Sequence, residues 1–326
     1  MQFLDVKTDF AFKKVFGSPH SKDLLISFLN ALLDVGDYPI VDLTIVDPYQ
    51  IPLIEGMKDT FVDVKAVLSN GSQVIIEMQV LSVEMEKRVL YHAAKAYSMQ
   101  LQRGQPYTLL NPVIALTITD FIMFPEEELK SFIITYFKLL ETRKFIEYSN
   151  DIELVFVELP KFQKTEAELT TLTDKWVYFV KHAGSLEMVP PPLACESEIV
   201  QAFQIANEAG LTKEELEVQD KKLRWLATQR LLQEQAGQVE AIERRLQQAQ
   251  QEVQQAQQEV QQAQQEVQQA KQETQQARLE AQQTARKIAQ QLFKTGAELA
   301  FIQQVTGLQW IELEAFHSLP AESNKS

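Results

Sequence analysis

The sequence predicts a mixed α/β fold that continues into a long helical extension. Residues 60–80 predict two β-strands joined by a tight turn, because β-branched residues fill 61–68 and 73–80 and turn-forming residues stand between them. Around this hairpin the expected order is helix, strand, strand, strand, helix, strand, which is the order of an α/β protein. A seven-residue apolar repeat over residues 239–288 predicts the extension.

The remaining elements follow from local spacing and turn residues. Two helices are expected in residues 5–33, separated by Gly17-Ser18-Pro19, and an irregular strand in 40–55. A long helix is expected over residues 84–103, and it ends at Gly104-Gln105-Pro106 because proline cannot continue a helix. Further strands are expected at 111–119, 132–139 and 152–159, followed by mostly helical structure from 164 to 232.

Polar residues interrupt the apolar pattern of the hairpin. Asp63 and Glu77 lie inside expected strands, where an unpaired carboxylate is costly to bury, so the pair calls for a cation or a proton. Side chains alternate along a strand, which places Glu77 and Gln79 on one face. An even-numbered turn at Asn70-Gly71 would send Asp63 to the other face, whereas a three-residue connection or a bulge pairs it with Glu77. We expect the odd register or a bulge.

The helix expected over residues 84–103 carries two stripes. Its buried stripe is predicted from residues at helical spacing, namely Leu90, Ala94, Tyr97 and Leu101. Arg88, Tyr91 and Lys95 fall on another face. This second stripe either orients a phosphate or a water, or is a solvated surface with extended basic side chains.

Seven landmarks along the chain occur in the order of a known family. They are DFAFKKVFG near the start, FLN at 28–30, VDV, IEMQ, the spacing of Arg88 and Tyr91, GQPYTLLNPVIALTI and ELPKF. An aspartate followed by Glu-x-Gln on the next strand resembles the metal site of the PD-(D/E)XK nuclease superfamily. Together the landmarks resemble the Rpn family of recombination-promoting nucleases and transposase-like proteins, over residues 3–235 and a C-terminal helical piece. Val62 replaces the usual proline, and Gln79 the usual lysine.

The resemblance implies a restriction-endonuclease-like core and a metal-dependent DNA endonuclease of low sequence specificity, acting in recombination, mobile-element biology or defence. Asp63 and Glu77 would bind Mg²⁺, or Mn²⁺ as a substitute, with the Met78 carbonyl and waters completing the octahedron. Gln79 would orient a water or a phosphate, and Lys65 is the nearest replacement for the missing lysine.

Residues outside the hairpin complete the expected site. The first helix of the superfamily often lends an acid, so Asp9 is either a catalytic residue or a first-turn acid favoured by the helix dipole. Glu55 is a second-rank candidate ligand. DNA contacts are expected from Lys13, Arg88, Tyr91 and Lys95. The alternative function is an inactive nuclease-fold scaffold that oligomerises through its coiled coil.

Composition bears on compartment and partners. The chain has 326 residues, 45% of them hydrophobic, and a formal net charge of −14, which opposes DNA binding because that depends on Lys and Arg. Basic residues nevertheless occur in the segments that build the expected site. The single cysteine, Cys195, the lack of a signal peptide and the lack of an apolar run of about 18 residues make a cytoplasmic protein without a membrane span the expectation. The four histidines lack metal-ligand spacing, so no zinc site is expected.

The repeat over residues 239–288 has valine favoured at a and alanine at d, and its seven heptads would form a helix about 75 Å long. Alanine at d buries little surface. The segment is therefore either a thin homodimeric coiled coil, or a single solvated helix or partly disordered Gln-rich segment. Beyond it, short helices with turns at Gly296 and Gly307 have a helix-turn-helix-like rhythm, and their acidic flanks equally fit packing or dimer closure.

These features divide the chain into four expected parts. They are a nuclease-like core at 1–163, a helical subdomain or linker at 164–235, a Gln-rich coiled coil at 236–288 and a C-terminal segment at 289–326.

Overall fold

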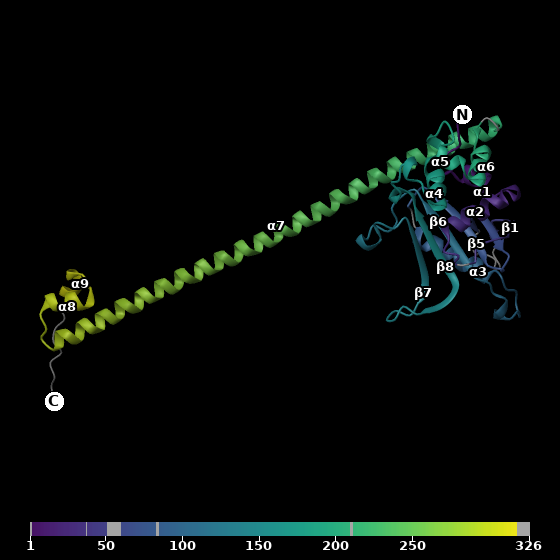
Figure 1. The fold of residues 1–326 in the computed structure, drawn as a ribbon. Coiled ribbons are helices and arrows are strands. Elements are labelled where there is room, and N and C mark those ends of the chain that lie inside the picture. The colour runs from purple at the N-terminus through teal and green to yellow at the C-terminus, as the bar shows by residue number, and fades with distance from the viewer. Residues whose placement is uncertain (1, 37, 51–59, 83–84, 209–210, 318–326) are drawn as a thin grey trace. The chain divides into compact units, whose positions relative to one another are not determined.

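A computed structural model of the chain describes residues 2–36, 38–50, 60–82, 85–208 and 211–317 (Figure 1). Contacts within the chain divide it into two compact units, Met1–Gln235 and Ala236–Ser326. The finer division into four parts stays a prediction. Glu55 lies outside the described residues.

Six strands form one mixed sheet in the first unit: β1 (Leu43–Val46), β4 (Val64–Leu68), β5 (Gln73–Gln79), β6 (Val113–Thr119), β7 (Ile134–Leu140) and β8 (Glu147–Glu158). Their spatial order is β1-β4-β5-β6-β8-β7 (Figure 1). The pairs β5/β6 and β6/β8 run parallel, and the other neighbours run antiparallel. A two-stranded ladder joins β2 (Tyr49–Gln50) to β3 (Thr60–Phe61). The predicted α/β class is confirmed.

The hairpin of β4 and β5 has the odd register that the sequence predicts. Val64 pairs with Ile76, and a three-residue connection is closed by the hydrogen bond from the Leu68 N–H to the Ser72 carbonyl (2.9 Å). The expected first strand is interrupted, because β3 ends at Phe61 and β4 begins at Val64. The regular register ends at Val64, because the Asp63 N–H donates to the carbonyl of Ile76, the residue that already pairs with Val64.

One face of the sheet is covered by helices that precede the strands in the chain and by helices that follow them. They are α1 (Asp9–Phe16), α2 (Lys22–Leu32), α4 (Leu172–His182), α5 (Pro191–Ala194) and α6 (Ser197–Ile205). Phe28 and Trp176 form an edge-to-face pair at 5.4 Å in the core on this face, which also holds Ile76 and Met78 of β5. Burial of such large apolar side chains is the main favourable term for folding.

The helix α3 (Met85–Ser98) covers the opposite face, where Val89 and Ala93 pack with Ile75 and Phe156. The predicted buried stripe was wrong: Leu90 is 54% exposed. The buried residues are Met85, Val89, His92, Ala93, Lys95 and Ala96. Small alanines let the helix lie close to the sheet, and the polar ring of His92 is accepted in the interior because it contacts a carboxylate.

Single-turn 3-10 helices lie at Pro19–Ser21, Tyr107–Leu109, Glu127–Leu129, Leu159–Lys161, Glu166–Glu168 and Ala183–Ser185.

The helix α7 (Lys213–Lys294) has 82 residues and contains the whole heptad segment. The segment is helical throughout, as predicted, and its apolar positions are open to solvent. Val253 and Val260, for example, are each 57% exposed. Pairing with a second helix is the usual way such a stripe is buried, and it remains a prediction here.

Two short helices follow, α8 (Leu299–Thr306) and α9 (Trp310–His317). They pack on the end of α7 through a small core of Ala289, Ile302, Leu308 and Leu313. Gly296 and Gly307 have φ values of 77° and 65°, so glycine stands at both predicted turns for a conformational reason. None of the described helices combines the length and apolar character that crossing a membrane requires.

Candidate functional site

The predicted site lies at the open end of the β4/β5 hairpin. Asp63 directly precedes β4, and Glu77 and Gln79 lie at the carboxyl end of β5. The Asp63 N–H donates to the Ile76 carbonyl at 3.1 Å, which ties the aspartate to β5 at the irregular start of β4. On the other side of β5, Glu77 and Gln79 pair with Thr117 and Thr119 of β6. Backbone hydrogen bonds to a neighbouring strand therefore fix the position of Asp63 and of Glu77.

The Asp63 carboxylate is largely buried and has polar partners. Its Oδ2 accepts from the Met78 N–H at 2.8 Å, and its Oδ1 lies 3.3 Å from the Lys13 ammonium of α1. Burial raises the pKa of Asp63 to about 6, although the Met78 N–H and Lys13 act in the opposite sense, and the negative charges of Asp9 and Glu77 raise it further. The carboxylate thus lies within electrostatic reach of two other acids.

Glu77 is nearly closed to water, with 4% of its surface exposed. Its Oε2 accepts from the Gln79 amide at 3.0 Å and lies 3.4 Å from the Arg88 guanidinium, and its Oε1 contacts the Nδ1 of His92. Both carboxylate oxygens therefore have partners. A buried carboxylate tolerates such a position only with this degree of pairing.

His92 was not predicted as a site residue, because the four histidines lack metal-ligand spacing in the sequence. The available signal was its spacing from Arg88, because residues four apart on a helix lie on the same face. Both side chains leave α3 toward Glu77. The pattern that matters on this helix is therefore Arg-x-x-x-His.

The other predicted residues lie in varied places. Lys65 pairs with Ile75 across the hairpin, and its pKa is lowered by burial, with Asp47 acting in the opposite sense. Asp9 lies in the first turn of α1 after the N-cap Thr8, half exposed, with its carboxylate 3.0 Å from Lys222.

Two of the predicted DNA contacts on α3 differ in exposure. Tyr91 is 37% exposed, whereas Lys95 is 3% exposed and its side chain lies inside the protein. Buried ammonium groups do not reach a phosphate outside. Lys13 and Arg88, in contrast, each have a side chain 45% exposed and lie beside Asp63 and Glu77, respectively.

A family model described as a PD-(D/E)XK nuclease family transposase matches residues 6–236, which is well over half of the chain. The chain belongs to this family. The family predicted from the landmarks is confirmed at this level. No curated protein and no solved structure gives a significant match.

PD-(D/E)XK nucleases generally use divalent metals. Among the residues that the structure describes, no three His, Cys, Asp or Glu side chains gather as a metal site, so the protein's own donors are two carboxylates and neutral oxygens. Mg²⁺ is often held by only one or two carboxylates and keeps several waters. Burial is the main cause of the raised pKa of Asp63, and the charges of Asp9 and Glu77 add to it. The chemistry of the donors, carboxylate and carbonyl oxygens, fits a hard divalent cation.

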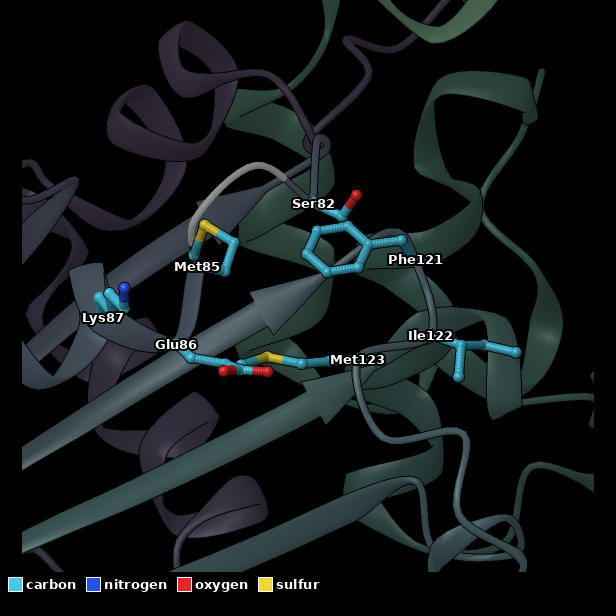
Figure 2. Close-up of a pocket in the computed structure, with 7 residues that line it drawn as sticks. All are labelled: Ser82, Met85, Glu86, Lys87, Phe121, Ile122 and Met123. Carbon is cyan, nitrogen blue, oxygen red and sulfur yellow. The ribbon is translucent and has the colours of Figure 1, made fainter. Parts of the chain in front are cut away.

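A cavity of about 340 Å³ opens next to these strand ends (Figure 2). It is lined by Ser82 after β5, by Met85, Glu86 and Lys87 of α3, and by Phe121, Ile122 and Met123 after β6. Figure 2 shows the Phe121 ring and the Glu86 carboxylate among these side chains.

A buried ion pair anchors the segment after β6. Glu158 Oε1 accepts from the N–H groups of Met123 and Phe124 at 2.7 and 3.1 Å, and its Oε2 lies 2.6 Å from the Lys161 ammonium. Glu158 and Lys161 belong to the ELPKF landmark. The motif thus has a structural role, because it fixes one wall of the cavity beside the carboxylates.

Proposed function

We propose that the chain is a Mg²⁺-dependent deoxyribonuclease that hydrolyses internal phosphodiester bonds of DNA with little sequence specificity. The observation that carries the proposal is the set of polar groups at the β4/β5 hairpin: Asp63 accepts from the Met78 N–H of β5, the charge of Glu77 acts on Asp63, and the Gln79 amide lies 3.0 Å from the Glu77 carboxylate. Membership of the PD-(D/E)XK nuclease family transposases supports it.

Asp63 and Glu77 would hold the ion, together with the Met78 carbonyl, and Mn²⁺ would substitute for Mg²⁺. When bound, such an ion activates a water and neutralises charge on the transferred phosphate. Gln79 orients a water or phosphate oxygen by hydrogen bonds but supplies no charge. Lys65, one residue into β4, is the proposed replacement for the usual lysine, and Asp9 adds negative charge from α1.

DNA is the proposed substrate, held by basic groups at the rim. Lys13 is half exposed and lies next to Asp63, and Arg88 is half exposed and lies next to Glu77, so each carboxylate has a cation beside it that a phosphate could contact. Tyr91 is the neighbouring aromatic side chain on α3. The net charge of −14 and the few cations at the site imply weak DNA binding with a shallow salt dependence, because the slope grows with the number of phosphates that Lys and Arg neutralise. Recombination, mobile-element biology or defence is the proposed setting.

One observation favours a second function. Glu77 is 4% exposed and both of its oxygens are engaged by His92, Gln79 and Arg88, which is also the arrangement expected of a structural carboxylate. In that case the core is an inactive platform, and the heptad segment of α7 recruits partners or a second copy.

A nicking assay on supercoiled plasmid separates the two functions. The full chain is expected to nick in Mg²⁺ and Mn²⁺ and not in EDTA, and Asp63→Asn and Glu77→Gln each abolish nicking. The matched control is Glu127→Gln, which removes a carboxylate that is 85% exposed. Mg²⁺-dependent nicking that survives in either site variant, or its absence in the parent chain, would refute the nuclease and favour the platform.

A further inference from the structure

The cavity beside the strand ends combines apolar and polar groups in an arrangement that the proposed hydrolysis does not use. Its walls are the Phe121 ring and the side chains of Met85, Met123 and Ile122, and its polar lining residues are Ser82, Glu86 and Lys87. An aromatic face with thioethers around it suits a flat ring, because bases stack on aromatic side chains and sulfur packs well against rings.

Its position ties the cavity to the carboxylates. Phe121 follows β6 by two residues, and the Asp120 N–H donates to the Gln79 carbonyl at 2.9 Å. The Thr119 hydroxyl donates to the Phe121 carbonyl at 2.8 Å, so the turn that carries the ring is fixed to the sheet. On α3, the lining residues Glu86 and Lys87 directly precede Arg88, which lies beside Glu77.

We propose that this cavity receives one unpaired nucleobase of the DNA substrate, and that it prefers a base with an amino group on its pairing edge. The proposal rests on the proposed function, whose substrate it narrows to DNA with a base out of the duplex stack. The base stacks on Phe121, its amino group donates to Glu86, and the backbone runs past Lys87 toward Arg88.

Charge decides the orientation and the preference. Lys87, which also lines the cavity, and Arg88, the next residue of α3, attract the phosphate backbone, whereas Glu86 repels it and accepts a hydrogen bond from an amino group. Cytosine offers such a donor and thymine offers a carbonyl oxygen at the same position, so a carboxylate accepts from the first and repels the second. A paired base keeps this edge inside the duplex and its faces against its neighbours, so only an unpaired or extruded base reaches the ring.

The test measures DNA binding by the full chain, with Ca²⁺ in place of Mg²⁺ so that affinity is read apart from cleavage. Fluorescence anisotropy compares three labelled duplexes of one sequence: fully paired, with a single bulged cytosine, and with a single bulged thymine. The chain is expected to bind the bulged cytosine about tenfold more tightly than the paired duplex and about tenfold more tightly than the bulged thymine.

Two variants assign the effect to the cavity. Phe121→Leu keeps an apolar wall and removes the stacking face, so the preference for bulged over paired DNA falls to about twofold or less. Glu86→Gln removes the charged acceptor, so the preference for cytosine over thymine is lost while the preference for a bulge stays. The matched control is Phe145→Leu, the same change at a ring that is 73% exposed and outside the cavity lining, and it leaves both preferences unchanged.

Equal binding of bulged and paired duplexes by the parent chain overturns the proposal, and so does an unchanged preference in Phe121→Leu. These results are distinct from failure of the proposed function. A chain that nicks in Mg²⁺ but ignores the bulge overturns the base site alone. A chain that prefers the bulge through Phe121 but never nicks overturns hydrolysis and upholds the base site.

Discussion

Glu158 and Lys161 form an ion pair that is closed to water, with side chains 0% and 4% exposed. The Lys161 ammonium donates to Glu158 at 2.6 Å and to the carbonyls of Phe124 and Leu129, each at 3.0 Å. Lys161→Met keeps the apolar stem but leaves the carboxylate buried without its cation. Removing one partner of such a pair destabilises a protein by about 3–5 kcal/mol, and we expect a loss in this range.

The double variant tests whether the loss arises from the pair itself. Glu158→Gln alone leaves the ammonium without a counter-ion and weakens the acceptor for the N–H groups of Met123 and Phe124. Removing both charges together leaves no unpaired ion. The double variant should therefore lose less than the sum of the single variants, with a coupling free energy of about 2 kcal/mol.

Urea unfolding of the full chain at pH 7, followed by tryptophan fluorescence, measures these free energies. Trp176 is fully buried in the first unit, whereas Trp225 and Trp310 are about half exposed, so the signal change reports mainly this unit. The control Lys130→Met removes a lysine that is 71% exposed and should change the free energy of unfolding by less than about 0.5 kcal/mol. A loss under about 1 kcal/mol in Lys161→Met, or additive losses in the double variant, would refute the reasoning.

Three further predictions concern the helix cap, the heptads and the basic rim. Burial alone raises the pKa of Asp174, but hydrogen bonds from Lys164 and Thr171 outweigh it and hold that pKa below its usual value. Its contribution to stability is therefore present above the ordinary aspartate pKa and lost as the pH falls through the lowered one. Asp174→Ala should lose about 1–2 kcal/mol at pH 7, with the difference from the parent shrinking in urea titrations as the pH falls below the ordinary aspartate pKa, and a constant difference would contradict this. In the full chain, Val253→Asp with Val260→Asp should convert a dimer to a monomer by light scattering, whereas Gln254→Asp with Gln261→Asp should not, and a monomeric parent would contradict the coiled coil. Lys13→Ala and Arg88→Ala should each lower the salt dependence of DNA affinity by about one unit of slope, unlike Lys221→Ala at a side chain 81% exposed, and unchanged slopes would remove these residues from the DNA-binding rim.

The geometry around Asp63 could be predicted from the sequence because three local facts agree. Two carboxylates interrupt apolar strands, side chains alternate along a strand, and an odd connection or a bulge is needed to keep both acids together. The structure has the three-residue connection and the Val64/Ile76 pair that this argument requires. The sequence did not show where the strand would be interrupted, because the Asp63 side chain accepts from the Met78 N–H, a contact that strand propensity does not reveal.

The face of α3 could not be predicted from hydrophobicity. Leu90 is the larger apolar residue, yet Ala93 and His92 face the interior, because close approach of the helix favours alanine and Glu77 gives the imidazole a partner. Lys95 is buried for reasons that its spacing does not reveal. Glu158 accepts hydrogen bonds from Met123 and Phe124, which are more than thirty residues away in the chain. Local sequence patterns do not reveal such distant partners.

Calorimetric titration with Mn²⁺ tests most directly whether two adjoining strands hold a divalent ion. It compares the full chain with its Asp63→Asn, Glu77→Gln and Glu127→Gln variants. The parent and the Glu127→Gln chain should bind one ion with the same affinity, and each of the other two variants should lose that binding. Equal Mn²⁺ binding by all four chains, or no binding by the parent, would contradict the shared carboxylate site.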